Sequence, residues 1–357
     1  MWSLLSQAQF FTILSPTAKL LLARLFLFLS VLALSAARAE SGGDGSSYQL
    51  GRGLAVGDTG IRFGGYASVE AGAPSPGPWE FSVSDLSLFT TWTDHAHWRF
   101  FSETEVGEAL TAGGNQGLST RNAHFELERL YIDRLFDDLF SLRFGKFLTP
   151  VGRWNLLHAS PLTWTTTRPV ATYDLFSKHA TGLMLHGGFP VLDRRMDYAF
   201  YADLTEELDP YRSADPFNNA LGSHWLYSAA DNLELGLSYV NYQLHDDPSH
   251  RFNLVGVEGA WFYRRFEFNT EWVYRNGGLQ GLYQGFVQGV APLVSHWYAI
   301  GRYEYFDQVQ QPAGQLGVFG LAFRPVPPLV WKVEYRIGTH NEISAPDGLY
   351  GSFAVLF

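Results

Sequence analysis

The segment Leu329–Ile337, LVWKVEYRI, alternates between two kinds of side chain along its whole length. The odd positions are apolar or aromatic, whereas three of the even positions are Lys332, Glu334 and Arg336. A helix would scatter these charges around its surface, but a β-strand places all of them on one face. The segment is therefore predicted to be a strand with one apolar face and one charged face.

Two further segments show the same period of two over a similar length. They are His97–Val106 (HWRFFSETEV) and Arg265–Arg275 (RFEFNTEWVYR). Strands in soluble sheets usually have about 5–6 residues, and these segments are longer. A tilted strand of about 9–11 residues has the length that crosses a lipid bilayer. The pattern therefore predicts membrane-spanning strands.

The composition excludes several classes of protein. The chain has 357 residues, a formal net charge of −10 and no Cys. A nucleic-acid partner is not expected, because phosphate contacts need clustered Lys and Arg. Without Cys there is no disulfide framework, thiolate zinc site or cysteine nucleophile. Only 17% of residues are charged and 16% are aromatic, which is not the composition of a disordered chain.

The first forty residues have the features of an export signal. Lys19 and Arg24 precede the apolar stretch LFLFLSVLALSAA, and Ala37–Ala39 supplies a small-x-small site. This combination predicts a cleaved secretory signal peptide over residues 1–39. The alternative is a retained signal anchor, but the apolar stretch is shorter than the roughly 20 residues that span a bilayer. The Gly- and Ser-rich residues 40–58 are predicted to form a flexible lead-in.

The rest of the chain, residues 59–357, divides into sixteen segments with strand periodicity. Their spans are 59–71, 80–93, 96–108, 122–133, 139–147, 181–187, 194–203, 219–228, 232–243, 251–262, 265–275, 279–290, 295–307, 315–324, 329–338 and 350–357. Short and long linkers alternate between them, with residues 276–278 as the exception. An even number of strands, with short turns at one end and long loops at the other, is typical of outer-membrane barrels. In lipid a sheet can span only if it closes, because every backbone polar group must be paired. We therefore predict an all-β transmembrane antiparallel barrel of about 16 strands; a soluble β-sandwich or β-helix is the alternative.

With its leader, aromatic-rich strands and C-terminal Phe357, the sequence resembles the Gram-negative outer-membrane porins. In addition, Leu142–Pro150 (LRFGKFLTP) precedes the longest linker, residues 148–180, and is similar to a pattern in the phosphate-selective and polymer-uptake porins. The resemblance implies that Phe357 is part of the signal read by the barrel-assembly machinery. It also implies that the linker 148–180, which is the third long loop, folds into the lumen. A homotrimer in outer-membrane lipid is a further implication. The net negative charge departs from the phosphate-selective group, whose pores are basic.

The linker 148–180 supplies the candidate residues of a pore constriction. It is rich in bulky apolar groups, whose exposure to water costs about 25 cal/mol per Å², so packing inside the barrel is favoured over an external loop. The alternative is an outward loop that packs on its neighbours or on a second subunit. The constriction candidates are Arg153, Trp154, Asn155, His158, Arg168, Tyr173, Asp174 and Lys178.

The alternation also sorts charged side chains onto the lumen face of the predicted barrel. The lumen-lining candidates are Arg99, Glu103, Glu105, Glu126, Glu128, Arg143, Arg265, Glu267, Glu271, Arg302, Glu304, Lys332, Glu334 and Arg336. Opposed rows of acids and bases would set a transverse field that favours polar solutes. The alternative is that these charges mostly pair across strands. The excess of acids predicts a mild cation preference.

These features predict a passive porin for small hydrophilic solutes or ions. We expect no enzymatic activity, no cofactor, no bound metal and no nucleic-acid partner. One alternative is a structural or adhesive barrel whose loops bind a partner. A less favoured alternative is a barrel-embedded lipid hydrolase, for which the sequence offers neither a Gly-x-Ser-x-Gly elbow nor a His-Glu-x-x-His motif.

Overall fold

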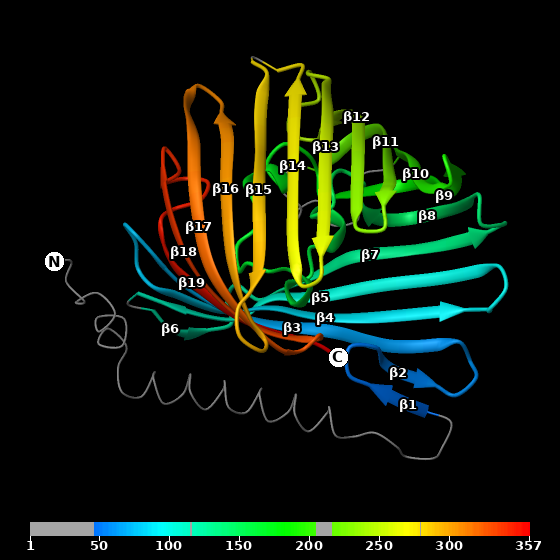
Figure 1. Ribbon diagram of the computed structural model, residues 1–357, viewed down its shortest axis with the longest axis horizontal. Helices are drawn as coiled ribbons and strands as arrows, with labels where there is room; N and C mark the ends of the chain where they lie inside the picture. The colour runs from blue at the N-terminus through cyan, green and yellow to red at the C-terminus, as the bar shows by residue number, and fades with distance from the viewer. Residues whose placement is uncertain (1–45, 115, 205–215, 279) are drawn as a thin grey trace.

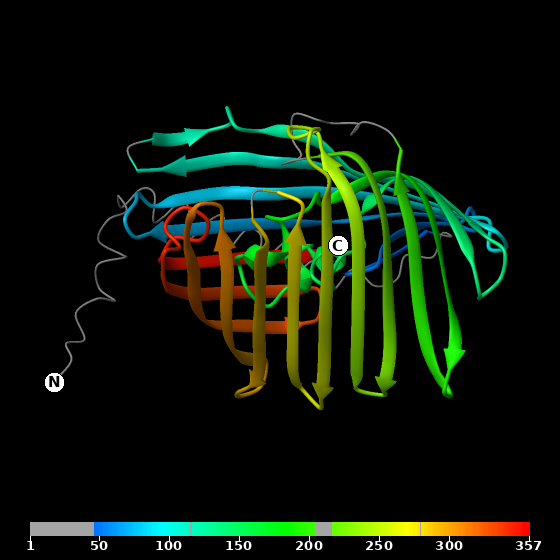
Figure 2. The same cartoon turned by 90° about the horizontal axis from the view of Figure 1, so that it is seen from above.

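The protein is a closed antiparallel β-barrel (Figures 1 and 2). The computed structural model describes residues 46–114, 116–204, 216–278 and 280–357, so the predicted leader lies outside the described residues. The described residues form nineteen strands in one sheet. Three of these are short, and the other sixteen make the barrel wall. The wall strands are β3 (Ile61–Pro74), β4 (Glu80–Thr93), β5 (Trp98–Gly113), β7 (His124–Leu135), β8 (Ser141–Leu148), β9 (His179–Val191), β10 (Arg194–Asp203), β11 (Phe217–Ala230), β12 (Leu233–Leu244), β13 (Phe252–Tyr263), β14 (Phe266–Asn276), β15 (Leu282–Pro292), β16 (Trp297–Gln308), β17 (Gln311–Val326), β18 (Leu329–Thr339) and β19 (Gly348–Leu356). The predicted sixteen-stranded barrel is confirmed.

The barrel closes where the last strand pairs with the first. β19 runs antiparallel to β3, with Phe353 opposite Val69. Beyond the strand, Phe357 and Gly65 exchange two backbone hydrogen bonds of 2.8 and 2.9 Å. This seam removes the unpaired edges that an open sheet would present, as a bilayer requires.

The two faces of β18 differ as its sequence predicts. Val333 and Tyr335 are 42% and 49% exposed on the outer face of the barrel, whereas Lys332 and Glu334 are only 5% and 2% exposed on the inner face. The alternation that identified the strand therefore separates an apolar exterior from a charged interior.

Replacing Val333 with Arg tests this assignment of faces. We expect Val333→Arg to lower the free energy of unfolding by about 2–4 kcal/mol, the cost of a basic side chain near the lipid midplane. The measurement is urea unfolding of the barrel in lipid vesicles. The control is Glu342→Arg, at an exposed position in the linker between β18 and β19. Equal stability of the two variants would contradict the assignment.

Most linkers have the predicted lengths, but the predicted long loop 308–314 is wrong. β16 continues to Gln308 and β17 begins at Gln311, and these two residues pair across a tight turn. Gln310 makes this turn possible by adopting a positive φ of 58°. Both strands extend beyond the alternating, membrane-spanning part of their sequences, and their ends are polar and rich in Gln. The sequence alone therefore predicts a loop at this position. Arg265, predicted on a strand, lies in the turn before β14.

Part of the predicted flexible lead-in is a β-hairpin. β1 (Ser46–Gln49) pairs with β2 (Gly53–Val56). β2 also pairs with β3, with Leu54 opposite Phe63. Pairing with the first wall strand satisfies backbone groups that a flexible segment would leave to water. A third short strand, β6 (Gln116–Ser119), extends the hairpin loop after β5.

The longest connection between wall strands joins β8 to β9. It contains the short 3₁₀ helices η1 (Asn155–Leu157), η2 (Ser160–Leu162) and η3 (Val170–Thr172). Among the residues that the structure describes, no helix combines the length and the apolar character needed to cross a bilayer.

Candidate pore and its inner segment

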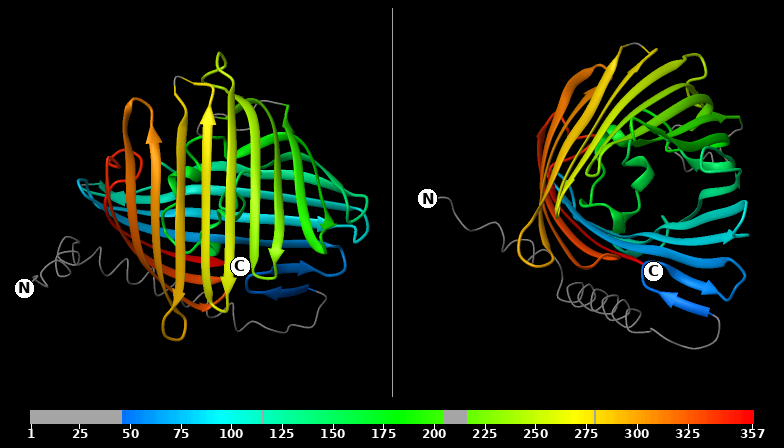
Figure 3. Two further views of the ribbon diagram at one scale, coloured as in Figure 1. Left: turned by 45° about the horizontal axis from the view of Figure 1, so that its top comes forward. Right: turned by 45° about the vertical axis from the view of Figure 1, so that its right-hand side comes forward.

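The connection between β8 and β9, residues 149–178, lies inside the barrel and is called here the inner segment (Figure 3). Val151, Leu175 and Phe176 in this segment are almost fully buried. They pack in one cluster with apolar residues of the surrounding wall, and Tyr242 on β12 donates a hydrogen bond to the Leu175 carbonyl. The predicted folding of the long third loop into the lumen is confirmed.

A glycine lets the inner segment approach the wall closely. Gly152 has a φ of +67°, and a Cβ at this position would lie 2.1 Å from Oε2 of Glu271 on β14. The Gly152 amide donates to Ser238 Oγ on β12 at 3.2 Å. A residue with a side chain would be strained here and would collide with Glu271.

Three glutamates of the wall accept hydrogen bonds from the backbone of the inner segment. Glu271 on β14 accepts from the Trp154 amide at 2.7 Å. Glu304 on β16 accepts from the Val170 amide at 2.8 Å, and Glu334 on β18 accepts from the Thr166 and Thr167 amides at 2.8 and 3.1 Å. Because these strands alternate around one side of the barrel, the carboxylates attach the segment at successive points.

Basic side chains on the same side of the wall bind the carbonyl and hydroxyl oxygens of the segment. Lys332 Nζ on β18 donates to the carbonyls of Ser160 and Thr165, both at 3.0 Å, and to two hydroxyls. Arg302 on β16 donates to the Thr167 carbonyl at 3.0 Å. Arg324 on β17, which the sequence analysis missed, donates to two further carbonyls of the segment at 2.8 Å. These cations therefore hold the segment against β16–β18.

The other predicted lumen-lining residues fall into several environments. The cross-strand pairs that the sequence offered as an alternative exist for Glu103, which binds Arg129, and for Arg143, which binds Asp133 at 2.7 Å. Glu128 binds Lys178 and His179 where the segment ends, and Glu267 accepts from the Trp164 indole at 2.8 Å. Arg99 is exposed near the start of β5, and Arg265 donates to Tyr298 from its turn. Glu105, Glu126 and Arg336 also lie on wall strands.

The eight predicted constriction residues divide into two groups. Arg153, Asn155 and Asp174 anchor the segment: Arg153 binds Glu234 on β12, Asn155 donates to the Thr149 and Lys178 carbonyls, and Asp174 accepts from Gln284 on β15. The other five line a cavity beside the segment. They are Trp154, His158, Arg168, Tyr173 and Lys178.

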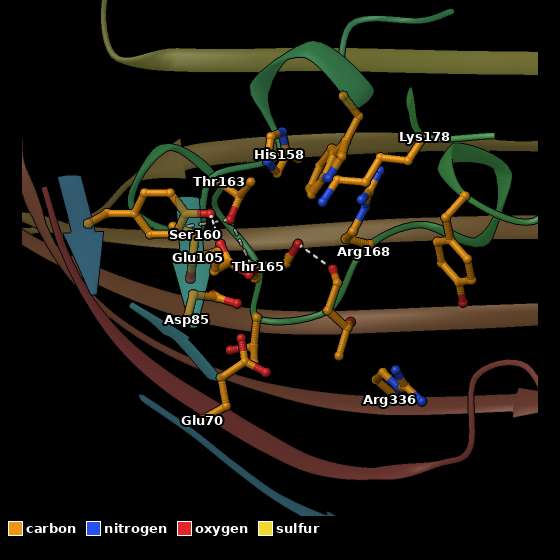
Figure 4. A pocket seen from close by; sticks show the side chains of 15 residues that line it. Glu70, Asp85, Glu105, His158, Ser160, Thr163, Thr165, Arg168, Lys178 and Arg336 are labelled. Carbon is orange, nitrogen blue, oxygen red and sulfur yellow. Dashed lines mark hydrogen bonds between the residues drawn. The ribbon is translucent and has the colours of Figure 1, made fainter. Parts of the chain in front are cut away.

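This cavity has a volume of about 350 Å³ and charges of opposite sign on its two sides. Figure 4 shows Glu70, Asp85 and Glu105 together on one side and Arg168 and Arg336 on the other. The acids belong to β3, β4 and β5, to which none of the anchoring hydrogen bonds described above runs. The sequence analysis missed Glu70 and Asp85. Glu70 lies between Val69 and Ala71 and could have been placed on the lumen face, whereas Asp85 follows Ser84 and has a weaker signal.

A second cavity, of about 300 Å³, follows the same open side of the inner segment toward β7–β11. Arg129, Arg143 and His186 are among its lining residues. Both cavities lie away from β12–β17, to which most of the anchoring hydrogen bonds run. Open space beside the segment is therefore found along β3–β5 and along β7–β11. Within the described ranges, no three His, Asp or Glu side chains converge as ligands for a metal ion.

The titratable groups of the inner segment have shifted pKa values. Burial would lower the pKa of Lys178, but the adjacent Glu128 carboxylate outweighs this effect and raises it, so Lys178 is cationic. Burial and the charge of Lys178 hold the pKa of His158 well below its ordinary 6.5. Burial, followed by the nearby Glu304, raises the pKa of Tyr173 to about 12. At neutral pH the segment therefore presents cations but a neutral imidazole.

We expect His158 to leave ion selectivity unaffected by pH between 6 and 8. An imidazole with an ordinary pKa would become cationic as the pH falls through this window and would reduce cation preference. Because the pKa of His158 lies below this pH range, the reversal potentials of the wild type and of His158→Gln should follow the same pH profile. A pH-dependent difference between the two proteins would show that His158 titrates in this range.

Comparison with solved structures places the barrel among outer-membrane porins in fold. An anion-selective porin from Comamonas acidovorans matches with a TM-score of 0.59 and 10% identity, over 83% of this chain and 99% of that one. The OmpF protein of Salmonella typhi, solved with daunomycin, has a TM-score of 0.59 and 9% identity, over 89% and 100%. The outer-membrane channel DcaP of Acinetobacter baumannii has a TM-score of 0.57 and 12% identity, over 83% and 97%. No protein-family model and no curated protein matches the sequence. The resemblance to porins is thus confirmed at the level of the fold.

Proposed function

We propose that the protein is an outer-membrane porin, with the inner segment as the constriction of a water-filled channel for small hydrophilic solutes or ions. The observation that carries this proposal is the attachment of the segment to one side of the lumen by Glu271, Glu304, Glu334 and Lys332. A polar cavity lined by Glu70, Asp85 and Glu105 remains beside the attached segment. Barrels of about 16–18 strands are too wide for side chains to fill, so whatever narrows the lumen sets its selectivity.

The location and partners follow from the same proposal. An apolar exterior with aromatic residues on β13, β14, β16 and β18 suits outer-membrane lipid. Export by way of the predicted leader 1–39, recognition of Phe357 by the barrel-assembly machinery and assembly as a homotrimer complete the proposal. It assigns the chain no enzymatic activity and no cofactor.

Single-channel recording tests the channel function directly. The mature chain is refolded, its barrel is verified by the heat-dependent change in electrophoretic mobility, and it is inserted into a planar bilayer in KCl. We expect discrete ohmic steps and, in a salt gradient, a reversal potential that indicates a mild cation preference. A correctly folded barrel that gives no current would contradict the proposal and favour the structural or enzymatic alternatives.

A further inference from the structure

None of the acids that line the 350 Å³ cavity forms an ion pair in the described part of the chain, and the charges of Lys332 and Lys178 act on them from nearby without direct contact. Asp85 and Glu105 are bound by hydroxyls, Asp85 by Ser68 and Glu105 by Tyr66 at 2.9 Å. Glu70 makes no hydrogen bond to any described residue. Three carboxylates from adjacent strands thus face one cavity, and only neutral groups contact them directly.

The guanidinium groups on the opposite side lack an acidic partner in the same way. Arg168 donates to the Thr172 carbonyl at 3.0 Å and to the Asn155 amide oxygen at 3.3 Å. Arg336 donates to the Pro346 carbonyl at 3.0 Å. Neither takes part in an ion pair among the residues described. By contrast, the charge of Lys178 is compensated by Glu128, so Arg168 and Arg336 supply the positive side.

The inner segment also carries unsatisfied hydrogen-bonding groups on residues that line this cavity. The His158 side chain is 7% exposed, it lines the cavity, and neither ring nitrogen has a hydrogen-bond partner among the described residues. The Nε atom of Arg168 is unsatisfied as well. Buried polar groups without partners are costly, so the segment carries hydrogen-bonding capacity beside the cavity that the described residues do not use.

Separated charges of opposite sign discriminate between solutes by their charge distribution. A cation is attracted by the acids and repelled by the arginines, and an anion experiences the reverse. A solute with both charges gains on both sides when its dipole lies across the cavity. A guanidinium recognises a carboxylate through paired hydrogen bonds, and carboxylates accept hydrogen bonds from an ammonium group. The volume is within the range of small-molecule sites, about 300–1,000 Å³.

Building on the proposed channel function, we propose that this cavity is a transit site selective for small zwitterions, α-amino acids in particular. The ammonium group of the solute faces Glu70, Asp85 and Glu105. Its carboxylate faces Arg168 and Arg336. During passage, the side chains of the site thereby replace the water molecules that the two charged groups of the solute lose.

The test compares four solutes of nearly equal size and different charge. L-alanine, lactamide, lactate and protonated alaninol are loaded together into proteoliposomes at pH 7, and their efflux is followed by mass spectrometry. We expect alanine to leave about threefold faster than each of the others, or more, because two weak charge contacts act together. The conductance of the same preparation in KCl is recorded in parallel.

Matched variants neutralise one side of the cavity at a time. Glu70→Gln/Asp85→Asn is expected to abolish the alanine advantage and speed lactate, whereas Arg168→Gln/Arg336→Gln should abolish it and speed alaninol. The control, Arg194→Gln/Glu342→Gln, changes exposed positions outside the lumen and should retain the advantage. A conducting wild type that passes alanine no faster than lactamide would overturn the zwitterion site alone, as would an advantage that survives both neutralisations. A folded barrel without current and without efflux of any solute would overturn the channel function itself.

Discussion

Removing the inner segment is expected to raise the single-channel conductance roughly threefold or more, because a sixteen-stranded barrel otherwise encloses an open aqueous channel. The variant replaces residues 153–176 with a short Gly-Ser linker, which retains the end of β8 and the Lys178–Glu128 contact. The wall strands keep all their pairings, since none of them pairs with the segment. Ion selectivity should weaken at the same time, because Arg168 is removed and the acids then face a wide lumen.

A shortened outer loop is the control for this deletion. Residues 246–250 belong to the linker between β12 and β13 and lie outside both cavities. Their removal should leave the conductance within the scatter of the wild type. If deletion of the inner segment also leaves the conductance unchanged in a barrel that shifts normally on electrophoresis, the segment does not obstruct the passage of ions.

The second large effect is expected from Lys332→Met, which removes a cation and leaves the barrel intact. Lys332 is 5% exposed and its Nζ binds four oxygens of the inner segment. Methionine has a similar volume but no donor, so these oxygens lose their partner inside the protein. Leaving buried polar groups unsatisfied costs about 1–3 kcal/mol each, although water in the lumen reduces this cost. We expect the segment to detach locally, with larger and noisier current steps.

The measurement for Lys332→Met combines channel recording with urea unfolding. Arg265→Met is the matched control, since Arg265 is exposed in a turn and does not contact the inner segment. We expect the unfolding midpoint of Lys332→Met to fall below that of the control. Current steps as quiet as those of the wild type would mean that the remaining anchors, such as Glu334 and Arg302, are enough to keep the segment in place.

The barrel wall was predictable from the sequence because each of its strands has one face toward lipid and the other toward the aqueous lumen. Val333 faces outward and Lys332 faces inward. Adjacent residues of a wall strand therefore differ in polarity, and the sequence shows this difference directly. Linker lengths then supplied the order of turns and loops. The error at 308–314 arose where the strands extend beyond the alternating region, since Gln308 and Gln311 carry no signal of either face.

The partners of the lumen charges were not predictable in the same way. Glu334 and Thr166 form a hydrogen bond inside the barrel, as do Glu271 and Trp154, and no local pattern connects positions so far apart in the chain. The alternation predicts a lumen-facing position for Glu271 and Glu334, but it offers only cross-strand pairing or an open lumen as their surroundings. Which residues face the cavity depends on the path of the inner segment, and that path is set by all these contacts together.

The seam between β3 and β19 determines when the barrel can finish folding. Its closing hydrogen bonds join Gly65, near the start of the wall, to Phe357. Pairing of the two ends of a long chain is slow, because the entropy of closing the largest loop is lost before the contact forms. Until Phe357 pairs with Gly65, both β3 and the growing end of the sheet expose edges that could pair with another chain. A chain truncated before β19 would therefore form an aggregation-prone open sheet in place of a smaller barrel.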